Sequence, residues 1–184
     1  MRIATDKLER IHRSVSALVE GHARDATVAA ATYALATLIL TSVHHAYGAY
    51  IYDTPWRYDT VLISAATAVV ILGSLAVRRA RPSGLPGALA AGLFVLVTLI
   101  VPVLTIGAFE GLYNHVLKNV LYFGGASSSL LARLFPPPTY EMPNDVFFEI
   151  TGILQTVPAA LTARHLYRMV RPRRMEISLD AAGD

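Results

Sequence analysis

Four apolar stretches constrain this chain more than any other feature of its sequence. They cover residues 26–43, 60–77, 85–109 and 146–163, and they contain a single charged residue, Glu149. Each is close to the roughly 20 residues that a helix needs to cross a bilayer. Since 54% of the 184 residues are apolar, we predict an all-α integral membrane protein, with four transmembrane helices in an up-down bundle.

The fourth stretch gives the weakest of the four predictions. It contains Glu149, Gln155 and Pro158, and a helix with such residues is stable in lipid only if its polar face meets other helices. A three-span protein with a peripheral fourth helix is therefore the alternative architecture.

The basic residues predict the orientation in the membrane. Of the 16 Lys and Arg residues, only Arg57, Lys118 and Arg133 fall on the side that the first and third stretches lead to. By the positive-inside rule, we expect both termini in the cytoplasm of a protein that spans the cell membrane. The opposite, outer side carries more acidic than basic residues, which raises the local concentration of cations.

One cytoplasmic segment is expected before the bundle, which covers residues 26–170, and another is expected after it. Apolar residues recur at helical spacing near the N-terminus: Leu8, Ile11, Val15 and Leu18. We expect residues 1–25 to hold an interfacial amphipathic helix, over residues 5–22, that binds anionic lipids or packs against a partner protein. Residues 171–184 are expected to form a short, disordered cytoplasmic tail.

The long outer loop, residues 111–145, is too hydrophobic for a flexible linker. Within residues 112–123 the polar side chains form one helical stripe. Its members are Asn114, His115, Lys118, Asn119 and Tyr122. We expect a helix in the outer interface with this stripe toward water, ended by Gly124 and Gly125. A second short helix over residues 128–134 would complete a partly helical cap.

Five polar residues are predicted to gather at the outer end of the bundle. An up-down arrangement places the end of the first span, the start of the second, the end of the third and the start of the fourth on one face. These ends and the loop beside them supply His44, His45, Glu110, His115 and Glu149. We interpret these five residues as a candidate metal site.

The spacing of small and polar residues predicts that His44 and Glu149 face other helices. The stripe on the first span consists of Ala30, Ala34, Thr37, Thr41, His44 and Gly48. The stripe on the fourth span consists of Glu149, Gly152, Thr156, Ala159 and Ala163. His45 is turned by about 100° from His44, so it reaches either an adjacent position in the same site or the lipid headgroups.

Imidazole and carboxylate ligands suit zinc, iron, manganese or copper(II). The chain has no cysteine, which excludes thiolate sites and disulfides. It also has no His-Glu-x-x-His run, so a zincin-type protease is not expected. Haem b held by His44 and His115 is a second interpretation, and it needs His115 to turn back into the bilayer. A structural polar network or a proton relay is a third.

We therefore predict a multi-pass membrane protein that binds a transition metal at its outer face. Such a metal could serve the oxidation or hydrolysis of a lipid-like or small apolar substrate. The alternative is a non-catalytic subunit that packs against a larger membrane complex, or against a second copy, through small-residue stripes. Membrane lipids are expected partners and nucleic acid is not. A pocket that reaches the histidines favours an enzyme, and small-residue stripes that face outward favour a subunit.

Overall fold

The computed structural model describes residues 2–137 and 139–171, with side chains from Gly21 onward except those of His22 and Ala23. All regular structure within these residues is helical. Four helices are long and apolar enough to cross a membrane: Arg24–Ile51, Pro55–Ala80, Gly84–Phe123 and Val146–Val170. The predicted all-helical class and the four apolar helices are thus confirmed.

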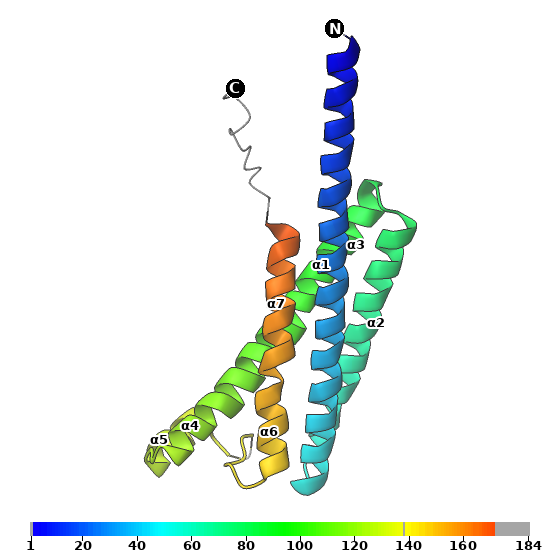
Figure 1. Cartoon of the computed structure of the whole chain (residues 1–184). Coiled ribbons are helices and arrows are strands. Elements are labelled where there is room, and N and C mark those ends of the chain that lie inside the picture. Colours follow the sequence, from blue (N-terminus) through cyan, green and yellow to red (C-terminus); the bar gives the residue numbers. More distant parts are fainter. Residues whose placement is uncertain (1, 138, 172–184) are drawn as a thin grey trace, which may run out of the picture.

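The first two of these long apolar helices lie side by side (Figure 1). α1 (Arg2–Ile51) is a single helix of 50 residues. After a tight turn, the short helix η1 (Pro55–Arg57) leads into α2 (Tyr58–Ala80), which returns along α1. α1 also contacts the last helix of the chain, so it occupies the centre of the arrangement.

The start of α1 differs from the prediction. The sequence predicts a separate interfacial helix over residues 5–22, whereas α1 continues without a break from Arg2 to Ile51 and extends past the ends of its neighbours (Figure 1). No proline interrupts this segment, and a single glycine such as Gly21 weakens a helix by only about 1 kcal/mol. Contact of this part with a membrane surface stays a prediction.

The third of these long apolar helices is much longer than predicted. α3 (Gly84–Thr98), η2 (Leu99–Leu117) and α4 (Lys118–Phe123) follow one another without a turn, and together they cross the other helices obliquely in Figure 1. The predicted separate helix over residues 112–123 is therefore wrong, and the outer loop begins only at Gly124. The reason is that no proline or glycine pair interrupts the chain between Glu110 and Gly124.

The middle section of this helix, η2, is a π-helix, in which backbone hydrogen bonds join residues five apart. Pro102 lies near its start and removes one backbone donor. The Thr105 hydroxyl donates to the carbonyl oxygen of Ile100, five residues earlier, at 3.0 Å. Because a π-turn holds more residues than an α-turn, side chains five positions apart on η2 face nearly the same direction.

The polar stripe on this helix faces the protein rather than water. Asn114, His115 and Lys118 are buried, whereas Val120 and Phe123 are exposed. The predicted direction of the stripe is thus reversed. The reason is that these side chains have polar partners within the protein: His115 contacts His44 and Glu149, and Lys118 contacts Glu149.

The fourth of these long apolar helices is split near its middle. α6 (Val146–Leu154) and α7 (Thr156–Val170) meet at Gln155. Pro158 follows the junction and cannot donate the backbone hydrogen bond that would continue the helix across it. The two halves together extend seven residues beyond the predicted end of this span.

Glycines let η2 approach α6 and α7 closely. A Cβ atom on Gly107 would lie 2.3 Å from Cβ of Ala159, and one on Gly111 would lie 2.6 Å from Cγ2 of Thr156. This is the spacing of small residues that allows membrane helices to pack at short range. The crossing brings the part of η2 that carries polar side chains against α6.

The inward stripe of α1 is confirmed. Its members, all buried, are Ala30, Ala34, Thr37, Thr41, His44 and Gly48. Further along the bundle, Leu38, Ile71, Phe94, Ile106 and Leu166 form the apolar core with the alanines of this stripe. The apolar core therefore fills one end of the bundle, and polar residues fill the other.

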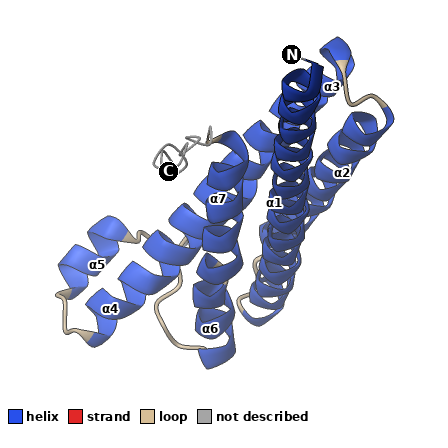
Figure 2. Cartoon of the chain, turned by 45° about the horizontal axis from the view of Figure 1, so that its top comes forward, coloured by secondary structure: helices blue, strands red, loops and turns tan. Residues whose placement is uncertain are grey.

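A short helix, α5, follows α4. α5 (Ser128–Leu134) has the predicted bounds and is joined to α4 through Gly125, whose φ is +80°. α4 and α5 extend away from the other helices (Figure 2). Residues 172–184, which include nearly all of the predicted disordered tail, lie outside the described residues.

Candidate metal centre

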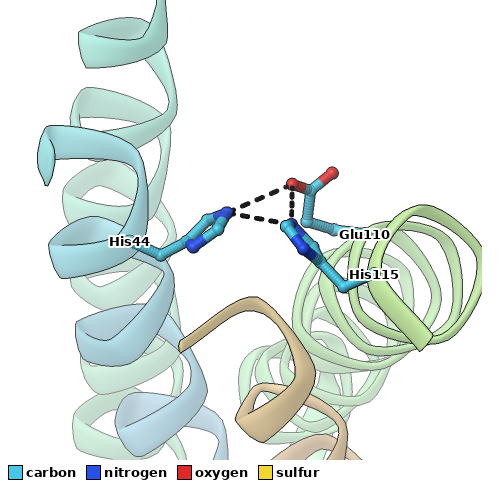
Figure 3. A group of neighbouring side chains, drawn as sticks. All are labelled: His44, Glu110 and His115. Carbon is cyan, nitrogen blue, oxygen red and sulfur yellow. Dashed lines mark hydrogen bonds and ion pairs between the residues drawn. The ribbon is translucent and has the colours of Figure 1, made fainter. Parts of the chain in front are cut away.

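Three side chains from two helices converge between α1 and η2 (Figure 3). His44 comes from α1, whereas Glu110 and His115 lie five residues apart on the π-helix and point the same way. The two Nε2 atoms of the histidines are 3.1 Å apart. Oε1 of Glu110 lies 3.6 Å from Nε2 of His44 and 3.4 Å from Nε2 of His115. This group could hold a metal ion, because its ligand atoms all lie within 4.8 Å of one another.

The hydrogen bonds around His44 determine which ring nitrogen carries the proton. Nδ1 of His44 lies 3.0 Å from the Thr151 hydroxyl. That hydroxyl donates its one hydrogen to the backbone carbonyl of Phe147 at 2.8 Å, with Phe148 as a second acceptor at 3.1 Å. With its hydrogen on the Phe147 carbonyl, the hydroxyl oxygen accepts from Nδ1–H of His44, which leaves the lone pair of a neutral ring on Nε2.

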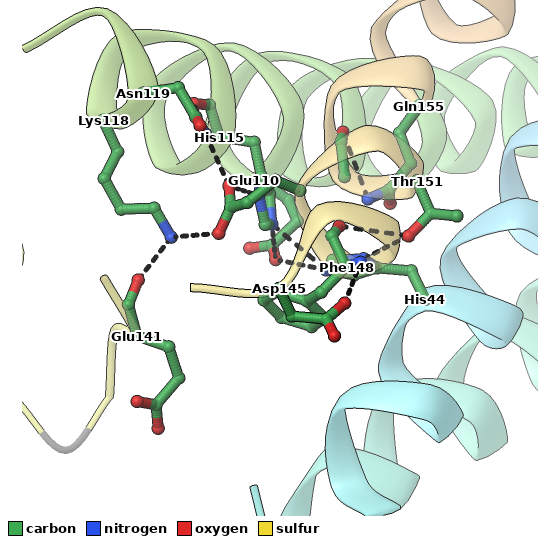
Figure 4. A network of polar contacts seen from close by, with 12 residues as sticks. His44, Glu110, His115, Lys118, Asn119, Glu141, Asp145, Phe148, Thr151 and Gln155 are labelled. Carbon is green, nitrogen blue, oxygen red and sulfur yellow. Dashed lines mark hydrogen bonds and ion pairs between the residues drawn. The ribbon is translucent and has the colours of Figure 1, made fainter. Parts of the chain in front are cut away.

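A carboxylate accepts a hydrogen bond from Nδ1 of His115 and so places the proton of this ring on Nδ1 (Figure 4). Nδ1 of His115 lies 2.8 Å from Oε2 of Glu149 and donates to it. The Asn119 amide also donates to this oxygen at 2.5 Å, and Nζ of Lys118 lies 3.2 Å from the other oxygen, Oε1. Glu149 thus does not join the group around Glu110. It lies behind His115, where outer carboxylates orient metal-binding histidines and raise their basicity.

The contact between the two histidines can be made in two ways, by a hydrogen bond from one Nε2–H to the other Nε2 or by a cation between two lone pairs. When both rings are neutral and both Nδ1 atoms carry the proton, two lone pairs face each other at 3.1 Å. Such lone pairs repel unless a proton or a cation lies between them. Zinc–nitrogen bonds of about 2.0–2.1 Å place ligand nitrogens about 3–4 Å apart, which matches the spacing of the His44 and His115 nitrogens.

His45 lies beside the same carboxylate but outside the three-residue group. Its Nε2 is 3.6 Å from Oε1 of Glu110, and its Nδ1 has no hydrogen-bond partner. Its ring is buried and meets that of His44 edge to face. A third imidazole therefore faces Glu110, next to the atoms that could hold a metal.

Close packing fixes the rings. The His44 ring stacks on Phe148 with centroids 4.1 Å apart, and α6 can present Phe148 there because Gly48 on α1 has no side chain. A Cβ atom on Gly152 would lie 2.3 Å from Cγ of His115. Both histidines are fully buried, while the Glu110 side chain keeps 14% of its surface exposed. Glu110 is thus the member of the group that is open to its surroundings.

Two hydrogen bonds hold the loop that precedes α6 next to this group. Nζ of Lys118 donates to the backbone carbonyl of Glu141 at 2.5 Å. Burial, followed by the negative charge of Glu149, raises the pKa of the Tyr52 phenol. The phenol therefore stays protonated and donates to Oδ1 of Asn144 at 2.5 Å.

The structure places the five predicted residues in three different positions. His44, Glu110 and His115 lie together, His45 faces Glu110 from one side, and Glu149 lies behind His115. That any of them binds a metal stays a prediction.

Sequence reasoning missed the supporting residues Thr151, Gly152, Lys118 and Asn119. The stripe that contains Lys118 and Asn119 is visible in the sequence, but its direction is not. The spacing of Gly152 from Glu149 marks an inward position, and nothing in the sequence marks Thr151.

Comparison of the chain with protein-family models, with curated proteins and with solved structures gives no match.

Proposed function

We propose that this is an integral membrane protein whose His44, Glu110 and His115 bind one divalent transition metal, zinc or iron in the first place. One observation carries the proposal. The Nε2 atoms of the two buried histidines face each other at 3.1 Å, while Thr151 and Glu149 occupy both Nδ1 atoms. Copper(II) and manganese have the same ligand preferences and follow in rank.

The ligand set favours a catalytic site over a structural one. Structural zinc sites are closed by four protein ligands, whereas two histidines and one glutamate leave a coordination position open. The partly exposed Glu110 and the unpartnered Nδ1 of His45 support an open side of this kind. Hydrolysis or oxidation of a lipid-like or small apolar molecule is the reaction class that we propose for such a site.

The polar contacts also bear on the alternatives. A haem between His44 and His115 would have to pass through the space that Oε1 of Glu110 fills, so this arrangement does not fit haem b. A proton shared by the two Nε2 atoms is the second candidate function, because it satisfies the same 3.1 Å contact. It would make the group part of a proton relay without any metal.

A non-catalytic subunit remains the alternative class, and the outer faces of α2 and α3 support it. Gly73 and Gly92 have no atom within 4 Å of the position that a Cβ would take. Val69 and Leu89, each about one turn from one of these glycines, are exposed. Lipids, a second copy or another membrane subunit would cover these faces.

We propose that the helices form an up-down bundle in the cell membrane with both termini in the cytoplasm. The distribution of basic residues supports this orientation. Reporter fusions after Asp184 and within residues 127–129 are expected to report opposite sides of the membrane. The same compartment for both reporters would contradict four spans.

Cobalt(II) titration of the metal-free protein tests the site. Cobalt(II) is expected to bind at one equivalent per chain and to produce the visible absorption of a four-coordinate ion. His115→Gln keeps much of the ring's volume but removes Nε2, so saturable binding should be lost.

The matched control is His165→Gln, because His165 of α7 stacks on Tyr33 of α1, about three helical turns from His44. This variant should titrate like the wild type. Unchanged binding in His115→Gln, or a visible band lost equally in both variants, would contradict the assignment.

A further inference from the structure

A cavity of about 330 Å³ lies on the far side of Glu149 from the histidines. It is bounded by α4, by α6 and by the turn that precedes α6. Its apolar walls are Phe123, Pro143, Val146, Ile150 and Ile153. Phe123 and Val146, at its mouth, are 73% and 74% exposed, so the cavity opens toward the medium around the helices.

The polar side of the cavity offers hydrogen-bond acceptors. It consists of Asn119, Asn144, Asp145 and Glu149. The Asn119 amide nitrogen uses its two hydrogens on the His115 carbonyl and on Oε2 of Glu149, which leaves its carbonyl oxygen. Glu149 is only 6% exposed, and its Oε1 accepts no hydrogen bond of normal geometry, although Lys118 lies 3.2 Å away.

The start of α6 does not make this cavity an anion site. Asp145 already occupies the helix N-terminus, where its Oδ1 accepts from the backbone N–H of Phe148 at 2.8 Å. Its other oxygen accepts from the Tyr47 hydroxyl at 3.1 Å. A bound anion would therefore meet the carboxylate of Asp145 at close range, where like charges repel, and Lys118, the cation beside Glu149, is already paired with that carboxylate.

We propose that this cavity binds the ammonium head of an amphiphile, whose apolar chain lies along the walls and leaves through the mouth. Two carboxylates and an amide oxygen at one end, and an apolar outlet at the other, are the complement of such a molecule. A volume of about 330 Å³ is at the lower end of ligand pockets, enough for a head group and the first part of a chain. Two sources share this chemistry, a single-chain alkylamine and an ethanolamine phospholipid.

The cavity and His115 share one neighbour, Glu149, whether or not a metal is bound. Glu149 lines the cavity with its carboxylate and holds Nδ1 of His115 with the same group. A head group at Oε1 would compete with Lys118 for this oxygen. Occupancy of the cavity would therefore change how His115 is held.

Native mass spectrometry of the full-length, chelator-treated protein in detergent tests the proposal. The probes are dodecylamine, dodecanoate and an ethanolamine phospholipid, each titrated separately. We expect one saturable amine-bearing ligand per chain, and the probe that binds more tightly identifies the source. Equal or tighter binding of dodecanoate, or no saturable binding of either amine-bearing probe, would overturn the proposal.

Two pairs of variants make the test specific. Ile150→Trp fills the cavity and should weaken binding by at least tenfold, whereas Leu154→Trp, one turn further on the same helix and outside the lining, should bind like the wild type.

Val146→Lys places a positive charge at the mouth and should abolish amine binding, whereas Val146→Glu should keep it. Because the protein is metal-free throughout, this result is independent of the metal site. Equal binding by both members of either pair would place the ligand elsewhere.

Discussion

Gly152→Ala is expected to destroy the metal site. The new methyl group would lie 2.3–2.4 Å from Cγ, Cδ2 and Nδ1 of His115, closer than any non-bonded carbon can approach, so the ring must move. Both its bond to Glu149 and the position of its Nε2 opposite His44 are then lost. Changes outside the first coordination sphere typically weaken metal binding by about 10–100-fold, and a displaced ligand should cost at least about 100-fold.

The control for this change is Gly73→Ala on α2. No atom lies within 4 Å of the added methyl group there, and alanine favours a helix over glycine by up to about 1 kcal/mol. This variant should keep the metal affinity and the thermal stability of the wild type. Metal affinity from competition titration and melting in detergent are the measurements. Wild-type affinity in Gly152→Ala would show that His115 is not a ligand in this geometry.

Glu149→Gln is expected to destabilise the protein strongly. Glu149 uses both oxygens, Oε2 for the hydrogen bonds from His115 and Asn119 and Oε1 for the ion pair with Lys118, whose Nζ lies 3.2 Å away. Glutamine has only one side-chain oxygen, so either His115 or Lys118 loses the oxygen atom that it contacts. The Lys118 side chain is 1% exposed, and removing the partner of a buried charge typically costs about 3–5 kcal/mol.

A second substitution separates the two roles of Glu149. In the Glu149→Gln/Lys118→Met protein the unpaired buried charge is gone, so most of the lost stability should return. Metal affinity should stay about 10–100-fold below that of the wild type, since the amide holds His115 less strongly than the carboxylate. Unfolding and metal titration of the two single variants and the double variant measure the coupling. Additive stability losses would contradict the ion pair.

The sequence predicted the elements that depend on periodicity. The buried stripe that contains His44, the inward position of Glu149 and the short helix α5 all appear where their spacing places them. Such patterns survive because a helix in lipid exposes apolar side chains wherever it lies.

The position of His115 could not be predicted from periodicity. The α-helical period of 3.6 residues places Glu110 and His115 about 140° apart, whereas the π-helix turns both toward His44. Nor does the sequence show that the helix continues past Glu110, because a charged residue at the end of an apolar run is also the usual sign of a membrane boundary. The pair Gly107 and Gly111 was the available signal, since its spacing of four marks a close helix contact that includes the start of the presumed loop.

His44 also has a larger structural role than its stripe suggests. Alanines at neighbouring inward positions imply that His44→Ala would be tolerated, yet the ring stacks on Phe148 and donates to Thr151. Removing it leaves a cavity and an unsatisfied hydroxyl. A loss of metal in His44→Ala would therefore not separate ligand from scaffold, and the glycine pair does so more cleanly.

The most direct test of the metal centre is the metal content of the wild-type protein, purified in detergent without added metal or chelator. Elemental analysis should be run beside Gly152→Ala and Gly73→Ala preparations of equal purity and dispersity. We expect close to one equivalent of zinc or iron in the wild type and in Gly73→Ala, and very little in Gly152→Ala. Wild-type protein without stoichiometric metal, or the same content in all three preparations, would contradict the metal centre and leave a shared proton between His44 and His115.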